Sequence, residues 1–372
     1  MNSNPPRRSA LSDFSVSGPP TAPTVTVAIP VYNEGATIGA VLAAMVAQDY
    51  PQLTAIYVID GYSTDQTQQV VCQAQQTDAR IQLIFNPRRR QAAALNLAFA
   101  QATTDIVMRL DAHATYAPDV VRQSVAALLR TGAGGVGAIA RPQPATTLVG
   151  QSIVAAHASK LGVGAAQFRQ ATATGWVDTV WNGCYWRHVV DAVGPFREDL
   201  PRTEDNDFHA RLTALGYGLY LEPAILAHYQ PRQTVGALWR QYWQNGLGIA
   251  QTLLTHHQAV RLRHLLPALL VASLLGLGVL SLLWRPAVFL LVAFLLLYAL
   301  AVGLFTLAAW HKQPGRHLLL LPVIFGTLHL SYGIGTLSGL GYHLLRVSLR
   351  KSLLMREEIS PVHPKPSLRQ RF

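Results

Sequence analysis

The sequence predicts an α/β domain, with a mostly parallel sheet and helices on both faces, followed by transmembrane helices. Short apolar runs alternate with helix-length segments from residue 25 onward, the pattern of a parallel sheet with right-handed crossovers. Several of these runs end in a carboxylate, and open sheets bind their ligands at the carboxyl ends of the strands. Finally, residues 265–283, 287–310 and 318–345 contain no Asp, Glu, Lys or Arg.

The expected elements follow from periodicity and turn residues. They are, in order, strand 25–32, helix 36–48, strand 55–60, helix 65–76 with Ser63 or Thr64 as N-cap, strand 81–85, helix 91–101, a strand from 106, helix 118–130, strand 134–141, helix 147–161, loop 162–175, strand 180–186, helix 203–215, strand 218–229 and helix 234–256. We expect this region to form one domain, 25–256.

The flanking regions have different compositions. Residues 1–24 are rich in Ser and Pro and lack the apolar core of a signal peptide, so we expect a disordered tail. Residues 257–345 are expected to form a membrane domain of two or three helices, because the first two apolar segments are long enough to cross a bilayer core of about 30 Å. Gly, Ser and two His interrupt the third segment, which either spans the membrane or is re-entrant or interfacial. Residues 346–372 form a basic tail.

The charge and the cysteines indicate where in the cell the protein lies and which partners it has. The net charge is +11, but the chain lacks a nucleic-acid-binding motif and much of the charge flanks the apolar segments. Attraction to anionic lipid explains this charge better than a nucleic-acid partner. Cys72 and Cys184 offer no disulfide framework and fit a reducing compartment. Basic residues at both ends of the first two apolar segments predict a cytoplasmic head at the plasma (inner) membrane.

Asp111 and His113 follow a buried apolar run. Alternation along a strand predicts that both point to the same side. A carboxylate and an imidazole can hold a divalent cation, which in turn can hold the diphosphate of a nucleotide-sugar. The alternative is that His113 is an ordinary loop residue.

Polar clusters recur at the ends of the predicted strands and at one helix start. They are Pro30-Val31-Tyr32-Asn33-Glu34, Asp60-Gly61-Tyr62-Ser63-Thr64-Asp65, Asp111-Ala112-His113 and Thr203-Glu204-Asp205. In order and spacing they resemble the motifs of family 2 inverting glycosyltransferases, and with the membrane segments they are similar to the ExoA-type enzymes of succinoglycan and other exopolysaccharide synthesis. The resemblance covers residues 25–250 and implies the GT-A fold.

The resemblance implies a donor site and a metal motif. Asp60 would contact the uracil or ribose of a UDP-sugar, and Pro30, Tyr32 and Glu34 would complete the pocket. Asp111 and His113 take the place of the Asp-x-Asp metal motif, which implies Mn²⁺ or Mg²⁺. Asp60 alternatively forms an Asx-turn, and Glu34 alternatively is an acid favoured at a helix N-terminus.

The resemblance also places the general base at Asp205, beside Glu204. On physical grounds alone, it is an equally good explanation that both residues are ordinary acids in the first turn of a helix. Arg88 belongs to an Arg run that meets either the diphosphate or anionic lipid. Trp181, Gly183 and Gln241 match acceptor-side positions, with core packing as the rival explanation for Trp181.

The implied activity is transfer of a sugar from a UDP-sugar to a lipid-linked (polyprenyl diphosphate) saccharide at the cytoplasmic face. One alternative is direct transfer to polyprenyl phosphate. Another, from a different class, is a non-catalytic nucleotide-binding membrane scaffold.

Overall fold

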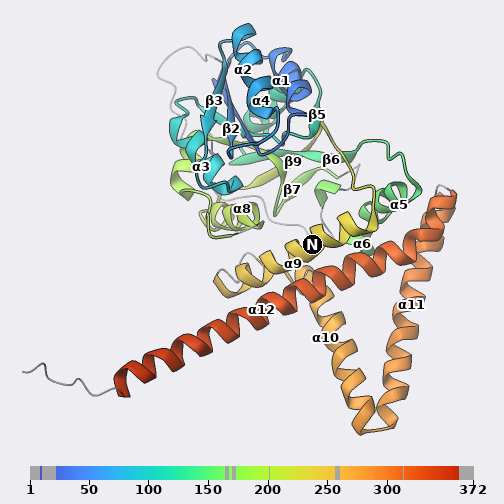
Figure 1. Cartoon of the computed structure of the whole chain (residues 1–372). Coiled ribbons are helices and arrows are strands. Elements are labelled where there is room, and N and C mark those ends of the chain that lie inside the picture. The colour runs from blue at the N-terminus through green and yellow to red at the C-terminus, as the bar shows by residue number, and fades with distance from the viewer. Residues whose placement is uncertain are drawn as a thin grey trace, which may run out of the picture.

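The computed structural model describes residues 9–10, 22–163, 167–169, 173–200, 202–255, 260–312 and 314–359, with side chains up to 345 (Figure 1). Most of the predicted N-terminal tail lies outside these residues. Within it, Ala10 is buried and its N–H donates to the Gly132 carbonyl at 3.0 Å. The remainder of the predicted tail stays a prediction.

The described strands form a nine-stranded sheet in the order β3-β2-β1-β4-β8-β6-β9-β5, with β7 also paired to β9. The strands are β1 (Val25–Val31), β2 (Leu53–Asp60), β3 (Ile81–Phe85), β4 (Ile106–Arg109), β5 (Ala114–Tyr116), β6 (Gly135–Pro142), β7 (Gly175–Val177), β8 (Trp181–Trp186) and β9 (Leu219–Tyr229). The half from β3 to β4 is parallel, as predicted. The other half is mixed, because β8 runs antiparallel to both β4 and β6.

Helices cover both faces of the sheet, as the alternating pattern predicts. They are α1 (Ile38–Val46), α2 (Thr67–Thr77), α3 (Gln91–Gln101), α4 (Val120–Thr131), α5 (Leu148–His157), α6 (Lys160–Val163), η2 (Gln167–Arg169), α7 (Arg187–Val193) and α8 (Glu204–Ala214). The helix after β2 starts at Thr67, and Asp65 instead of Ser63 or Thr64 accepts an N–H there, from Thr67 at 3.0 Å. Parts of the predicted loop 162–175 lie outside the described residues.

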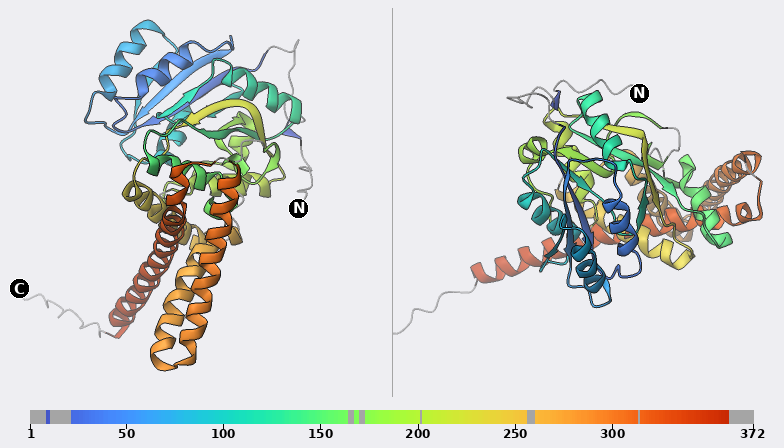
Figure 2. Two further views of the ribbon diagram at one scale, coloured as in Figure 1. Left: turned by 90° about the vertical axis from the view of Figure 1, so that its right-hand side faces the viewer. Right: turned by 90° about the horizontal axis from the view of Figure 1, so that it is seen from above.

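Four long helices complete the chain: α9 (Val235–Thr255), α10 (Leu262–Leu283), α11 (Pro286–Lys312) and α12 (Leu321–Ile359), the last preceded by η4 (Arg316–Leu320). Figure 2 shows α10 and α11 as a hairpin that projects away from the sheet domain. Among the described residues, three segments are long and apolar enough to span a membrane: α10, α11 and Arg316–Leu345. In the most apolar windows of the first two, 11% and 6% of residues are buried, against 50% in the third.

The third apolar segment packs along α9 beneath the sheet domain (Figure 1). Glycines allow this close approach. A Cβ at Gly335 would lie 2.3 Å from the Trp243 carbonyl oxygen, and one at Gly246 would lie 2.2 Å from the Tyr332 carbonyl oxygen. The Gly-rich sequence of the third segment is therefore explained by backbone-to-backbone helix packing.

Candidate active site

A cavity of ≈ 520 Å³ opens at the carboxyl ends of β1 and β4 and at the start of α8. It brings together predicted site residues from distant parts of the sequence: Pro30, Tyr32, Glu34, Asp111, His113, Glu204, Asp205 and Gln241. Its wall also carries several arginines. Carboxylates and cations therefore share one hollow at the edge where open sheets bind ligands.

Arg109, the last residue of β4, links two of the predicted acids. Its guanidinium forms an ion pair with Asp205 and another with Asp111 at 3.3 Å. Burial opposes the charge on Arg109, but the neighbouring Asp205, Asp111 and Glu204 outweigh this and raise its pKa. Arg109 thus stays charged at any physiological pH and fixes the two carboxylates relative to each other.

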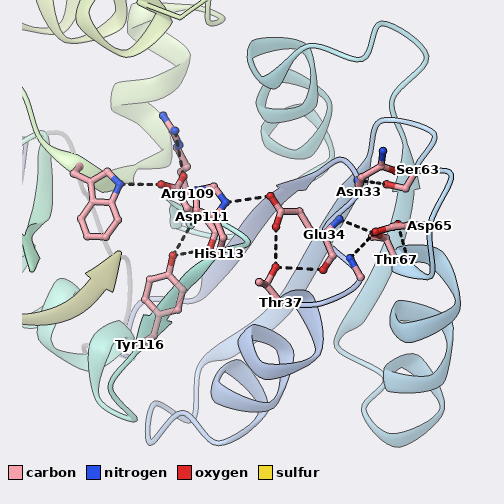
Figure 3. A network of polar contacts seen from close by, with 12 residues as sticks. Asn33, Glu34, Thr37, Ser63, Asp65, Thr67, Arg109, Asp111, His113 and Tyr116 are labelled. Atoms are coloured by element: carbon pink, nitrogen blue, oxygen red, sulfur yellow. Dashed lines mark hydrogen bonds and ion pairs between the residues drawn. The ribbon is translucent and has the colours of Figure 1, made fainter. Parts of the chain in front are cut away.

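Asp111 is held from several directions (Figure 3). The Trp181 indole N–H donates to its Oδ2 at 2.8 Å, and Arg109 donates to its Oδ1. The Tyr116 hydroxyl accepts the Asp111 N–H at 2.8 Å and lies 2.9 Å from the Asp111 carbonyl oxygen, to which it donates. Since β4 ends at Arg109, Asp111 and His113 occupy a turn instead of a strand, yet both still line the cavity.

His113 is oriented by Glu34, with Nδ1 3.1 Å from the carboxylate Oε1 (Figure 3). This hydrogen bond raises the pKa of His113 despite burial. Burial opposes ionisation of Glu34, but hydrogen bonds from His113 and Thr37 lower its pKa overall. When Nδ1–H donates to Glu34, the neutral imidazole keeps its lone pair on Nε2.

This arrangement fits a cation held partly by substrate. A carboxylate behind a histidine is the usual support of a metal-ligating imidazole. Within the described ranges, no group of three or more His, Cys, Asp and Glu is arranged to hold a metal ion. Asp111 and His113 can supply two ligands, and Mg²⁺ or Mn²⁺ sites in phosphoryl-group enzymes commonly take the others from substrate phosphates and water.

Glu204 and Asp205 begin α8 and face the cavity. Burial, and then repulsion from Asp205, raises the pKa of Glu204 to about 7. Glu204 Oε2 and Asp205 Oδ1 are buried and have no hydrogen-bond partner in the part of the chain that is described. Thr203 does not cap this helix, because its hydroxyl lies 2.5 Å from that of Thr252 in α9. Each acid therefore has one buried oxygen that is left for a bound group.

Two predicted donor-site residues lie outside the cavity wall. Asp60 is fully buried and accepts hydrogen bonds from the Ser63 N–H and from the Gln68 amide at 2.7 Å. These hydrogen bonds tie the carboxylate to the turn that follows β2, and the flanking Ile59 and Gly61 line the cavity. The donor-binding role of Asp60 stays a prediction. Arg88 turns outward to an ion pair with Glu198.

Of the three residues predicted on the acceptor side, one lines the cavity and two do not. Gln241 lines the cavity and accepts a hydrogen bond from Arg232 at 3.2 Å. Trp181 donates a hydrogen bond to Asp111 but does not itself line the cavity. Gly183 packs under the Tyr185 ring, where a Cβ would lie 1.9 Å from the hydroxyl oxygen. Close packing within the sheet thus requires glycine here, and the acceptor-side role of Gly183 stays a prediction.

Arg89 and Arg90, which belong to the predicted Arg run, line the cavity although Arg88 does not. Four other arginines of the wall were not singled out from the sequence: Arg109, Arg169, Arg202 and Arg232. The role of Arg109 could have been predicted from the sequence. It stands inside the apolar run Ile106–Leu110, and an arginine buried there needs a carboxylate partner. A wall with this many guanidinium groups suits a diphosphate, to which Arg can bind through two parallel hydrogen bonds.

Comparisons with known proteins agree with this geometry. The profile of "Glycosyl transferase family 2" matches residues 26–163. The chain is 30% identical to the succinoglycan biosynthesis protein ExoA of Rhizobium meliloti over 249 residues, which are 66% of this chain and 75% of ExoA. It is 24% identical to the dolichyl N-acetyl-α-D-glucosaminyl phosphate 3-β-D-2,3-diacetamido-2,3-dideoxy-β-D-glucuronosyltransferase of Methanococcus voltae, over 85% of this chain and 97% of that protein.

The fold has a solved counterpart in the mannosyltransferase PcManGT of Pyrobaculum calidifontis, determined with GDP-Man and Mn²⁺. The TM-score is 0.59 at 21% identity, over 85% of this chain and 88% of that one. This similarity establishes the GT-A type of fold that the motifs imply. With the profile match and the ExoA similarity, it leads to one conclusion: the chain belongs to glycosyltransferase family 2 and is a glycosyltransferase.

Proposed function

We propose that this enzyme transfers a sugar, with inversion, from a nucleotide-sugar such as a UDP-hexose to a lipid-linked saccharide in exopolysaccharide assembly. The observation that carries the proposal is the single cavity shared by Asp111, His113, Glu204 and Asp205. ExoA, similar over two thirds of the chain, is a succinoglycan biosynthesis protein, and the Methanococcus relative is described as acting on a dolichyl-linked sugar. The apolar helices support a membrane-bound acceptor.

In the proposed reaction, the donor diphosphate lies among the cavity arginines. Asp205 takes the proton of the acceptor hydroxyl while that oxygen bonds to the anomeric carbon. The bond from the anomeric carbon to the diphosphate oxygen breaks on the opposite side, and the nucleoside diphosphate leaves. A divalent cation held by Asp111 and His113 supplies Lewis-acid stabilisation of the diphosphate charge. Arg109 holds Asp205 in place through their ion pair.

The test is a donor-hydrolysis and transfer assay on the purified full-length protein with UDP- and GDP-sugars. Assays with Mn²⁺, with Mg²⁺ and with chelator report the cation requirement. Asp205→Asn should lower transfer by about 10²-fold or more, since a positioned general base contributes about 10²–10⁴-fold. Asp191→Asn is the matched control, because Asp191 lies on the surface in a pair with Arg187.

Three outcomes would contradict the proposal. Unchanged turnover in Asp205→Asn would show that Asp205 is not the general base. Wild-type protein that binds the donor but neither hydrolyses nor transfers it would favour a nucleotide-binding scaffold without catalysis. Transfer to polyprenyl phosphate in the absence of any lipid-linked saccharide would favour the direct-transfer alternative.

A further inference from the structure

A second cavity, of ≈ 470 Å³, lies between the sheet domain and the membrane helices. Its walls come from α6, η2, α9, α10, α11 and α12. The apolar part of the wall consists of Leu161, Phe168, Leu266, Pro267, Leu270 and Leu328. Because apolar surface is buried favourably, this wall suits a hydrocarbon ligand.

The second cavity adjoins the catalytic one. Arg169 and Asn245 line both cavities. Asn206 lines the second cavity, and its neighbour in α8, Asp205, lines the first. A ligand that fills the apolar cavity can therefore present its polar end toward the proposed base.

Two cations stand at this cavity without a carboxylate partner among the described residues. Lys160 is exposed. Arg169 lies 3.5 Å from the His157 ring nitrogen and over the Tyr229 ring at 5.3 Å. A third cation, Arg263, is already paired with Asp178 at 2.9 Å. Unpaired cations beside an apolar wall are complementary to an amphiphile with an anionic head.

The cavity also meets the surface where the lipid would lie. Leu266 belongs to its wall and is 56% exposed. It lies on α10, one of the helices long and apolar enough to cross a membrane. A long hydrocarbon chain can therefore leave the cavity past Leu266 without crossing the protein.

We propose that this second cavity binds the polyprenyl diphosphate part of the acceptor. The first isoprene units lie against Leu270 and Leu328, the diphosphate lies at Lys160 and Arg169, and the saccharide reaches past Asn245 to Asp205. The inference rests on the proposed function and adds the place at which the acceptor lipid binds. Membrane phospholipid is the competing occupant.

The experiment uses the full-length protein in nanodiscs and a polyprenyl diphosphate that carries a photoreactive group in its first isoprene units. Cross-links should map to the cavity segments of α10 and α12. Leu270→Trp fills the cavity and should lower cross-linking about tenfold, the loss expected for an obstructed apolar contact. Leu269→Trp is the matched control, because Leu269 is 54% exposed on the same helix and is not in the wall.

Additional measurements keep the outcome interpretable. Lys160→Gln changes only an exposed side chain and should also reduce cross-linking, so the test does not depend on Leu270→Trp folding normally. Donor hydrolysis should persist in both variants. If wild-type protein shows no donor hydrolysis, the proposed function fails, whereas cross-linking still judges the lipid site.

Three results would overturn the inference. Equal cross-linking in Leu270→Trp and wild type is the first. The second is a loss of cross-linking in Ala309→Trp but not in Leu270→Trp. Ala309 lines a neighbouring cavity of ≈ 740 Å³, which Lys160 and Arg169 also line. The third is complete displacement of the probe by an equal concentration of phosphatidylglycerol, which would identify an ordinary lipid site.

Discussion

Arg109 is the residue on which the geometry of the site depends. It is 8% exposed, and it touches two carboxylates on separate elements. A buried ion pair that loses one partner leaves an uncompensated charge, at a cost of about 3–5 kcal/mol. The planar guanidinium can hold two acids at once, which the single ammonium of Lys cannot do in the same geometry.

We therefore expect Arg109→Lys to remain folded but to lose about 10²-fold in kcat, as expected when a preorganised charge contact is removed. Arg109→Gln should in addition lower the thermal unfolding midpoint. Transfer kinetics and thermal unfolding in detergent measure the two effects. Arg122→Lys is the control, because Arg122 also bridges two carboxylates, Asp49 and Asp119, but on the surface. Equal effects in both Lys variants would contradict this role.

Glu204 makes the stability of the folded protein depend on pH. Its pKa is raised from 4.5 to about 7, so the folded state holds a proton that the unfolded state has released. The stabilisation is fully present below pH 4.5 and is lost as the pH rises through about 7. Glu204→Gln lacks this titration. Its unfolding midpoint should therefore rise relative to wild type between pH 5 and pH 8.

Thermal unfolding without donor, at several pH values, measures this difference. Glu198→Gln is the control, because hydrogen bonds and ion pairing with Arg88 overcome burial and lower the pKa of Glu198 below 4.5. Its difference from wild type should stay flat over the same range. A flat difference for Glu204→Gln would show that Glu204 is ionised throughout.

At the residue scale, the sequence predicted several site positions from polar residues after strands and at one helix start. Glu34, Asp111 and His113 follow strands, Asp205 lies in the first turn of α8, and all four reach the cavity. Asp60 also ends a strand, but its oxygens are used by the following turn. Sequence alone does not decide between a ligand and a local hydrogen bond, because both need the same carboxylate at the same place.

At the element scale, local periodicity predicted most helices and strands with small shifts at their ends. The strand 81–85 and the helix 91–101 have the expected bounds. The antiparallel insertion of β8 between β4 and β6 was missed. Partner choice in a sheet depends on contacts between distant segments, here Met108 with Cys184, and no local pattern encodes it.

The helix pair of α9 and α12 gives the third apolar segment a structural role. At Gly335, a Cβ would meet the backbone of Trp243 in α9. At Gly341, in the same helix, a Cβ would meet nothing within 4 Å. The two glycines therefore differ in packing while sharing the same intrinsic helix propensity.

Gly335→Ala should accordingly separate the two helices and destabilise the protein by about 1–3 kcal/mol, the usual cost of overpacking. Gly341→Ala should be neutral or stabilising by up to about 1 kcal/mol, since Ala favours helix more than Gly does. Thermal unfolding and the protease sensitivity of the chain between α9 and α10 report both variants. Equal behaviour of the two would show that α12 does not need this contact.

On the scale of the whole molecule, the two cavities adjoin each other through Arg169 and Asn245, and α10 lines the second of them. Figure 2 shows the hairpin of α10 and α11 projecting away from the sheet domain. Basic residues lie at both ends of the hairpin: Arg261 and Arg263 at its start, Lys312 and Arg316 at its end. The positive-inside tendency therefore supports a head on the cytoplasmic side. The third segment, half buried against the protein, then need not cross the bilayer.

This arrangement predicts the side on which the chain ends. The tail carries Arg346, Arg350, Lys351 and Arg356, and moving it outward would oppose the same charge tendency. In a bacterial host, alkaline phosphatase fused after Phe372 should be inactive and green fluorescent protein fused there should fluoresce. Phosphatase inserted after Arg285, at the tip of the hairpin, should be active and serves as the control. An active C-terminal phosphatase would mean that α12 spans the membrane. It would contradict the prediction that α12 lies at the membrane interface, packed on α9.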